Sequence, residues 1–426
     1  MQRRLGSLLA LVLATVTACS SAGGPGGGVG LAVADVPRAA APAGDATAAA
    51  QALNDFGLDL YRAAPDASGN LVVSPASIAL ALAMARAGAR GETAAQMDAV
   101  LRAAAADEHA SWLNALEAAL TSRSGTFKDA GGQDSKVTLR IANAPFVQRD
   151  LALEPAYLEA LASRFGAGVR LVDYVAATEV ARQAINGWVS DQTERRIPEL
   201  LTPGDLDALT RLVLVNAIYL KAAWQTPFPE AATAPGPFTR LDGSTISVTR
   251  MNLTETLPYA AGEGWRAVEV PYVGGSLAMT IIVPDDLRTF EAKLDAAAFG
   301  QITSALSPHS VALGLPKFRI ETRTDLAGVL AGLGMPLAFD PDRADFSGIT
   351  AAEQLYISAV VHQADIAVDE KGTEAAAATA VVIGTTAAPS DQVTLRIDRP
   401  FLFALRDVPT GALVFLGRVT EPVVDG

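Results

Sequence analysis

The sequence predicts an α+β fold, with helices first and a large amount of mainly antiparallel sheet after them. Three observations support this prediction. Apolar residues recur at helical spacing early in the chain. From about Val137 onward, apolar runs of strand length dominate. Turn signals rather than helical patterns separate these later runs, and no internal repeat is visible.

The composition indicates a folded domain and narrows the functions it can serve. Half of the 426 residues are hydrophobic and 19% are charged, which allows a sizeable core. The formal net charge of −13 repels phosphate backbones, so nucleic-acid binding is not expected. Cys19 is the only cysteine, which excludes an intramolecular disulfide. His109, His309 and His362 lack metal-ligand spacing, so no metal or other cofactor is expected.

The first residues have the pattern of an export signal. Arg3 and Arg4 precede an apolar run over residues 5–16 that is too short for a permanent membrane span. The run ends in Val-Thr-Ala-Cys, which resembles a bacterial lipobox with Cys19 as the lipidated residue. We therefore expect residues 1–18 to be removed and the protein to be exported and tethered to the outer face of a bacterial membrane. An ordinary secretory signal next to a cysteine is the alternative.

A Gly, Ala and Pro-rich stretch follows, and a single domain follows that. Residues 19–47 hold too few large apolar side chains for a core and predict a flexible tether. The domain is expected to cover residues 48–426. Its first helix is indicated by Leu53, Phe56 and Leu60 at helical spacing.

The second predicted helix is buried on all sides. Pro75 suits its first turn, and residues 78–84 are apolar almost all round. Gly88 and Gly91 are expected to end it. Residues 93–96, Thr-Ala-Ala-Gln, predict a capping box that starts the next helix.

The later part of the chain is expected to consist mainly of strands. The polar residues 122–135 predict an exposed loop before them. A nearly continuous apolar run predicts a strand covered on both faces, and two pairs of runs around Gly-containing turns predict hairpins. These segments are residues 213–220, the pair 268–272 and 277–283, and the pair 401–405 and 413–417.

Two motifs suggest enzyme chemistry and are better explained as turns and loops. Residues 274–278 come within one residue of a nucleophile elbow around Ser276, but an alternating strand follows where that motif needs a helix. Asp340, Asp342 and Asp345 lack the glycine and terminal glutamate of a calcium loop. A surface-anchored hydrolase centred on Ser276 remains a competing hypothesis.

Residues 369–389 form the most unusual segment of the chain. Taken at a period of two from Thr373, one face is wholly small or apolar, and the other carries one charge at its start. Such a strand could slide into the middle of an existing sheet, because no proline or bulky side chain obstructs its first half. Gly372 stands where a hinge needs backbone freedom. An alanine-rich helix and a loose linker remain alternatives from composition alone.

Residues 370–379 resemble the hinge of inhibitory serpins, which is a glutamate, any residue, glycine, threonine and then small residues. Other segments resemble serpin signatures in the family's order over about residues 48–422. They are residues 70–77, 215–224, 315–318, 358–362, 399–403 and 417–419. Each is weak alone, whereas their ordered sum is specific.

The resemblance implies a serpin fold, with three largely antiparallel sheets and an exposed reactive-centre loop over about residues 370–392. It also implies a monomeric, non-enzymatic inhibitor of serine proteases. A protease would cut the loop and form a covalent acyl complex, and residues 373–383 would then insert as a central strand. The implied hinge residues are Glu370, Gly372, Thr373, Glu374, Ala375, Ala376, Ala377, Ala378 and Thr379.

The family's usual spacing from Gly372 places the scissile bond between Thr386 and Ala387, with Thr385–Thr386 as the next candidate. A small side chain there suits an elastase-like or subtilisin-like protease rather than a trypsin-like one. A non-inhibitory serpin that acts as a carrier or chaperone is the alternative, although such members tend to have bulky, charged or proline residues in the hinge.

The resemblance also assigns residues beneath the place where the sheet opens. Trp224 would pack at the insertion point. Leu220 and Ala222 depart from the phenylalanine and glycine that serpins usually have there. The implied polar cluster consists of Ser74, Ser77, Asn216 and His362.

Overall fold

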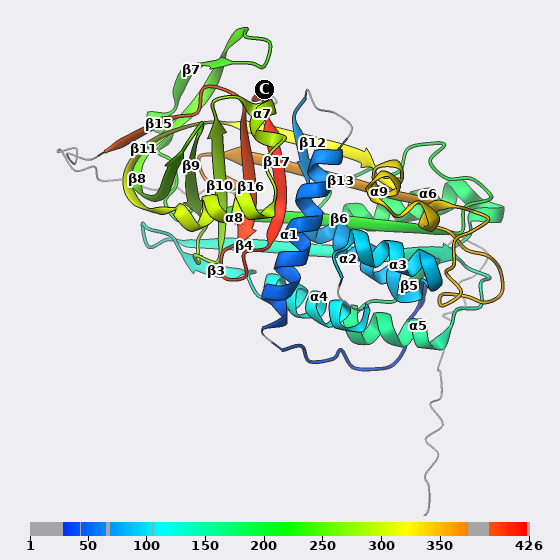
Figure 1. Cartoon of the computed structure of the whole chain (residues 1–426). Helices are drawn as coiled ribbons and strands as arrows, with labels where there is room; N and C mark the ends of the chain where they lie inside the picture. The colour runs from blue at the N-terminus through cyan, green and yellow to red at the C-terminus, as the bar shows by residue number, and fades with distance from the viewer. Residues whose placement is uncertain (1–28, 43, 65–68, 104–105, 374–391, 424–426) are drawn as a thin grey trace, which may run out of the picture.

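The computed structural model describes residues 29–42, 44–64, 69–103, 106–373 and 392–423. Its helices and two large sheets confirm the α+β fold class (Figure 1). The helices are α1 (Asp45–Ala63), α2 (Pro75–Gly88), α3 (Gly91–Val100), α4 (Ala106–Thr121), α5 (Pro155–Ala160), which continues as the π-helical turn η1 (Leu161–Phe165), α6 (Tyr174–Gln192), α7 (Leu287–Glu291), α8 (Ala296–Ala305) and α9 (Ala327–Leu333).

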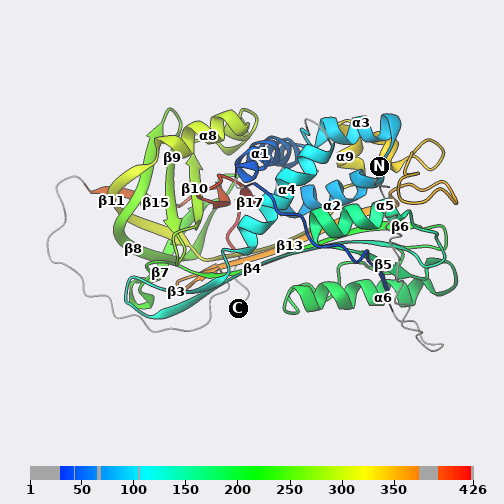
Figure 2. The ribbon, with the colours of Figure 1, turned by 90° about the horizontal axis from the view of Figure 1, so that it is seen from below.

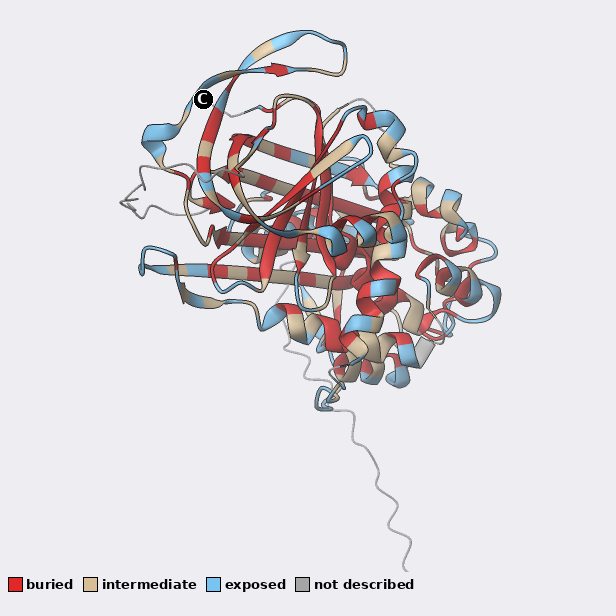
Figure 3. Ribbon diagram, turned by 60° about the vertical axis from the view of Figure 1, so that its left-hand side comes forward, coloured by how far each residue is buried: buried red, intermediate tan, exposed pale blue. Residues whose placement is uncertain are grey.

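The first sheet contains the predicted buried strand at its centre. Its eight strands run in the order β1-β5-β4-β6-β14-β13-β12, with β3 paired to β4. They are β1 (Gly30–Ala32), β3 (Gly125–Lys128), β4 (Asp134–Gln148), β5 (Val169–Val172), β6 (Leu212–Ala223), β12 (Phe318–Asp325), β13 (Ala359–Asp369) and β14 (Gly372–Thr373). Helices α2 and α6 cover opposite faces of this sheet (Figure 2). The continuous apolar run of β6 is therefore explained, since both of its faces are buried (Figure 3).

The second sheet has nine strands in the order β15-β11-β8-β9-β10-β16-β17-β2, with β7 paired to β8. They are β2 (Leu71–Val73), β7 (Ala234–Thr239), β8 (Thr245–Gly262), β9 (Trp265–Pro271), β10 (Leu277–Pro284), β11 (Ser307–Pro316), β15 (Val393–Arg396), β16 (Phe401–Asp407) and β17 (Leu413–Val419). Both predicted hairpins are present, as β9–β10 and β16–β17.

The expectation of three separate sheets is corrected in one respect. In the described part of the chain, the strands join into two hydrogen-bonded sheets. The reason is the length of β8, whose 18 residues pair with β7 and β11 along most of the strand and with β9 at its end. Two of the three expected sheets are therefore joined through β8 into the nine-stranded sheet.

Helix α2 forms as predicted and lies in the core. The Ser74 hydroxyl accepts a hydrogen bond from the Ser77 amide at 3.3 Å, and Pro75 occupies the first turn. The helix ends at Gly88, where a Cβ would lie 2.1 Å from Cγ1 of Ile349. Close packing against Ile349 therefore requires a glycine at this position.

The predicted capping box at residues 93–96 is wrong. Helix α3 already begins at Gly91, and both side chains bind elsewhere. The Thr93 hydroxyl accepts from the Asp345 amide at 3.0 Å, and Gln96 Oε1 accepts from the Leu337 amide at 3.1 Å. Tertiary contacts have taken the groups that a local cap would use.

The predicted loop over residues 122–135 and the helix-poor second half of the chain also need correction. Strand β3 pairs with the start of β4, so most of the polar stretch is a hairpin with exposed side chains. Helices α5 to α9 lie between the later strands. These helices are short, except for α6, so their apolar periodicity covers few turns.

The tether predicted to reach residue 47 is too long. Strand β1 pairs antiparallel with β5, and Arg38 forms an ion pair with Glu117 at 2.7 Å. Helix α1 begins at Asp45. Backbone pairing explains this result. The edge of β5 offers hydrogen-bonding groups to the backbone of residues 30–32, although the side chains there do not predict a strand. No helix in the described ranges is long and apolar enough to cross a bilayer.

Candidate functional site

The candidate site lies where the eight-stranded sheet divides. Strands β6 and β13 pair with each other, in parallel, along residues 213–217 and 359–363. At the other end the short strand β14 lies between them and is antiparallel to both. Thr373 stands opposite Ala222 on one side and Val368 on the other. The chain that enters the predicted loop therefore already occupies the first position of a central strand.

Between the part where β6 and β13 pair directly and the part where β14 separates them, the facing edges of the two strands are not paired with each other. The backbone of residues 218–221 on β6 bonds only to β4 among the described strands, and that of residues 364–367 on β13 bonds only to β12. These two edges continue directly from the place where β14 ends. These are the two edges with which a further strand would form hydrogen bonds.

Gly372 has a conformation and a packing environment that other residues cannot share. Its φ is +151°, and a Cβ there would lie 2.1 Å from the carbonyl oxygen of Ala222. The glycine therefore allows the chain to turn out of β13 and approach β6 closely. This explains in physical terms why the sequence has a glycine at the predicted hinge.

Thr373 is held by an aromatic pair at the insertion point. Its side chain is 1% exposed, and its hydroxyl shares a hydrogen bond of 2.6 Å with the hydroxyl of Tyr272. The Tyr272 ring stacks on Trp224 with a centroid distance of 4.4 Å. The Trp224 indole in turn donates to the carbonyl of Asp369 at 2.9 Å. The structure thus places Trp224 at the point where β14 begins, and Tyr272 is a site residue that the sequence did not reveal.

Glu370 binds the start of this segment to the connection between β11 and β12 and to the residue before β7. Its carboxylate binds the Lys317 ammonium at 2.6 Å and accepts from the Thr233 hydroxyl at 2.8 Å. Burial by itself raises the pKa of Glu370, but these hydrogen bonds outweigh it and hold the pKa below its ordinary value. Lys317 belongs to a segment that resembled a family signature, but no role could be assigned to it from sequence.

The predicted polar cluster lies beneath the paired part of β6 and β13. The Ser74 amide donates to Nε2 of His362 at 3.1 Å, so the proton of the neutral ring is on Nδ1 and is donated to Oδ1 of Asn216 at 2.6 Å. Ser77 is linked to this group through the Ser74 hydroxyl, but its own hydroxyl donates to Asn143 on β4 at 3.1 Å. The cluster therefore joins α2 to β4, β6 and β13. Asn143 is a member that the sequence did not indicate.

Burial of His362 leads to a testable pH dependence. Burial lowers the pKa of His362 to about 3, so the native protein keeps this ring neutral while an unfolded chain takes up a proton below about pH 6.5. The free energy of unfolding should therefore fall as the pH drops below 6.5, by about 1.4 kcal/mol per pH unit from this residue until the pH approaches 3. Urea unfolding at pH 7 and pH 5 should show a smaller change in His362→Gln than in the wild type. His109 is a second buried histidine with a lowered pKa, so His109→Gln should also reduce the pH dependence. An equal pH dependence in wild type and His362→Gln would contradict this assignment.

The remaining predicted site residues lie outside the described residues. They are Cys19, Glu374, Ala375, Ala376, Ala377, Ala378, Thr379, Thr386 and Ala387. The two departures from the family pattern do lie in the site: Ala222 pairs with Thr373, and Leu220 belongs to the stretch of β6 that pairs with β4 but not with β13.

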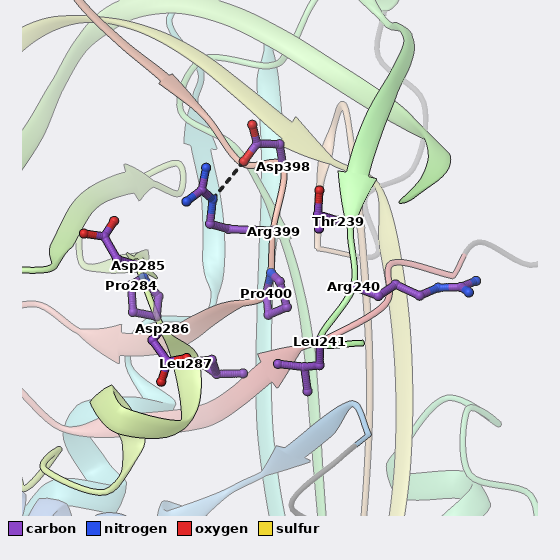
Figure 4. Close-up of a pocket in the computed structure, with 10 residues that line it drawn as sticks. All are labelled: Thr239, Arg240, Leu241, Pro284, Asp285, Asp286, Leu287, Asp398, Arg399 and Pro400. Atoms are coloured by element: carbon purple, nitrogen blue, oxygen red, sulfur yellow. Dashed lines mark hydrogen bonds and ion pairs between the residues drawn. The ribbon is translucent and has the colours of Figure 1, made fainter. Parts of the chain in front are cut away.

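Ser276, which was considered for enzyme chemistry, lies in the turn that directly follows Tyr272. Strand β10 follows Ser276 at once, so the helix of a nucleophile elbow is replaced by a strand. A cavity of about 370 Å³ between β7, α7 and the chain before β16 is lined by three aspartates and two arginines (Figure 4). In it Asp398 pairs with Arg399 at 3.1 Å, and Arg240 pairs with Glu421 outside the cavity. No group of three potential metal ligands gathers among the described residues.

Comparison with known proteins assigns the class that this fold and site suggest. The family model described as "Serpin (serine protease inhibitor)" matches residues 51–422. The leukocyte elastase inhibitor of Sus scrofa is 37% identical over 86% of this chain and 97% of its own length. Plasminogen activator inhibitor 1 of Neovison vison is 36% identical over 88% of this chain and 94% of its own length. The chain belongs to the serpin family.

Solved structures agree with this assignment. The thermophilic serpin tengpin in its native state has a TM-score of 0.78 and 28% identity, over 91% of this chain and 96% of its own. Uncleaved ovalbumin has a TM-score of 0.78 and 26% identity, over 88% of this chain and 99% of its own. The serpin fold predicted from the sequence is therefore confirmed.

Proposed function

We propose that this serpin inhibits serine proteases by suicide-substrate trapping, in which the cut loop inserts between β6 and β13. The single observation that carries the proposal is β14, which already lies between these strands and is antiparallel to both. The names of the relatives support it, since they describe inhibitors of leukocyte elastase and of plasminogen activators.

The register of β14 specifies how insertion would continue. If the strand extends without a bulge, Glu374 comes to lie opposite Lys221 of β6 and Thr379 opposite Asn216. On the other side, the same count places Thr379 opposite His362 of β13. Both counts agree with the direct β6–β13 pairing, since each of its five pairs would be separated by one inserted residue from 378 to 382. Insertion therefore requires no shift of either neighbouring strand along its length.

The two faces of the inserted segment match their surroundings. Residues 375, 377, 379, 381 and 383 would share the face of Thr373, which looks toward the main core and the His362 cluster. Ala378, Ala380 and Val382 would face α6, beside the apolar side chains of Val213, Val215 and Ala217. Small residues are needed in this part because both sides of the sheet are already packed. The alternating pattern of residues 373–383 is thereby explained.

Insertion would be favourable, so the uncut state must be metastable. Each residue added to a central strand contributes a net hydrogen-bond free energy of about 1 kcal/mol, and burial of Val381 and Ile383 adds to this. The barrier is the separation of the β6–β13 pairs and of the His362 cluster beneath them. The polar cluster therefore has a kinetic role, since it holds closed the part of the sheet that insertion must open.

The residues at the proposed scissile bond indicate the class of target protease. With the scissile bond at Thr386–Ala387, the residue that enters the specificity pocket is small and β-branched. An elastase-like or subtilisin-like protease has a shallow apolar pocket of that kind. A trypsin-like protease would need a lysine or arginine in this position, and the sequence has none between Thr373 and Gln392.

A denaturing gel tests the proposal. After the protein is mixed with an elastase or a subtilisin, a band at the summed mass of both proteins should survive boiling in SDS. The same protease with its nucleophilic serine replaced by alanine should give no such band, because no acyl-enzyme can form. Mass spectrometry of the released peptide should place the cut within one or two residues of Thr386. Complete cleavage of the loop without a covalent band would favour the carrier or chaperone alternative. Export and membrane tethering through Cys19 stay predictions.

A further inference from the structure

A second cavity lies far from the insertion point, between α2, α4 and the α5–η1 helix. Its volume is about 280 Å³. Three arginines and one histidine line it, together with Phe165 and five alanines. None of the lining residues is acidic, although acidic residues outnumber basic ones in the chain as a whole. The cavity therefore concentrates positive charge in a protein whose net charge is −13.

The three arginines differ in how their charges are compensated. Arg86 binds Asp98 through two parallel hydrogen bonds, each 2.6 Å long, so its charge is largely balanced. Arg90 donates only to the carbonyl groups of Ala87 and Ala89, at 3.1 and 2.8 Å, and has no carboxylate partner among the described residues. Arg164 has neither a hydrogen bond nor an ion pair to any part of the chain that the structure describes. Two guanidinium groups at this cavity are thus available for an anion.

The surroundings of Arg90, Arg164 and His109 differ as well. The Arg90 guanidinium lies against Gly348, where a Cβ would be 2.3 Å from its central carbon, so a larger residue at 348 would displace it. Arg164 is the basic residue in the last turn of η1, a helix that contacts α2. His109 is 4% exposed and lies edge-on to Trp112 at a centroid distance of 6.4 Å. Burial, aided by Arg86 and opposed by Asp98, lowers the pKa of His109 to about 4, so at neutral pH its ring can donate one hydrogen bond without adding a charge.

We infer that this cavity is a binding site for a small molecule bearing a phosphate or sulfate group. Guanidinium groups recognise such oxyanions by parallel hydrogen bonds, and the anion would balance the charges of Arg90 and Arg164. The volume exceeds what an inorganic phosphate needs, and the alanines and Phe165 would contact an apolar part of the ligand. The site does not depend on loop insertion, so its failure and that of protease trapping are separable.

Calorimetric titration tests the inference with inorganic phosphate, phenyl phosphate and sulfate, each against chloride at equal ionic strength. The whole uncut protein should bind at least one of these oxyanions saturably. Arg164→Gln and Arg90→Gln should each weaken that binding at least tenfold, whereas Arg288→Gln, an exposed arginine on α7, should leave it unchanged. Gly348→Ala should weaken it as well, because Arg90 would be displaced.

Protein folding is checked by the melting temperature in chloride, which Arg164→Gln should leave within a few degrees of the wild type because the residue has no described partner. Protease trapping by Arg164→Gln should also match the wild type. Absence of saturable binding for all three oxyanions would overturn the inference. The inference would also be overturned if Arg164→Gln and Arg90→Gln bound the oxyanion as tightly as the wild type does. The same holds if Arg288→Gln lost as much affinity as they do.

Discussion

Replacement of Thr373 by arginine is expected to abolish protease trapping while cleavage of the loop continues. Thr373 is 1% exposed and lies between Ala222 and Val368. An arginine there would have to bury its charge without a partner, at a cost of several kcal/mol, or keep the strand from entering. Because insertion competes with hydrolysis of the acyl-enzyme, even a few kcal/mol on the barrier slows insertion by a factor of hundreds. Less than one tenth of the protease should then remain as covalent complex on a denaturing gel.

Two further variants make this result interpretable. Thr245→Arg places the same charge on an exposed position of β8 and should trap protease normally. Ala377→Arg should fail like Thr373→Arg, since the register puts residue 377 on the same face beside Ile218. Thr373 is already packed in the uncut protein, so misfolding is a second explanation for lost trapping by Thr373→Arg. Ala377→Arg tests insertion and leaves the Thr373 contacts unchanged. Full trapping by Ala377→Arg would exclude insertion in the proposed register.

Elements with a strong local pattern could be predicted from the sequence. Helix α2 and strand β6 are continuous apolar runs of different length, and the β9–β10 and β16–β17 hairpins have glycine-containing turns. The pattern that predicts each of these helices, strands and hairpins lies within a short stretch of sequence. The resemblance to serpin signatures added the order of the elements, and the comparisons confirm it.

The contacts that hold the insertion point could not be predicted in the same way. Tyr272 and Thr373 are 101 residues apart in the chain, and Asn143 and Ser77 are 66 apart. A hydroxyl or amide has many possible partners at such separations, and no local pattern selects one. Strand β1 was missed for a related reason: its backbone pairs with β5, whereas its sequence, Gly-Leu-Ala, has no strand pattern of its own. Polar side chains likewise concealed β3, which lies at the edge of its sheet.

Cleavage of the loop is expected to raise the melting temperature of the protein by on the order of 10 °C or more. The register allows roughly ten residues to join the sheet, and each adds about 1 kcal/mol of net hydrogen bonding. A domain of this size unfolds with an entropy near 2 cal/mol/K per residue, so about 10 kcal/mol corresponds to a shift of that order. Differential scanning calorimetry before and after limited digestion by a protease that cuts near Thr386 measures it directly.

The size of this shift distinguishes insertion from simple cleavage of an exposed loop. A cut that leaves residues 374–383 outside the sheet creates two chain ends and no new contacts, so the melting temperature should stay constant or fall. In the inserted form, the edges at residues 218–221 of β6 and 364–367 of β13 gain partners, and their amides should become protected from hydrogen exchange. Ala377→Arg, which still presents the loop to protease, should be cut without either change. An unchanged melting temperature in the cleaved wild type would show that no strand has inserted between β6 and β13, and trapping would then require another explanation.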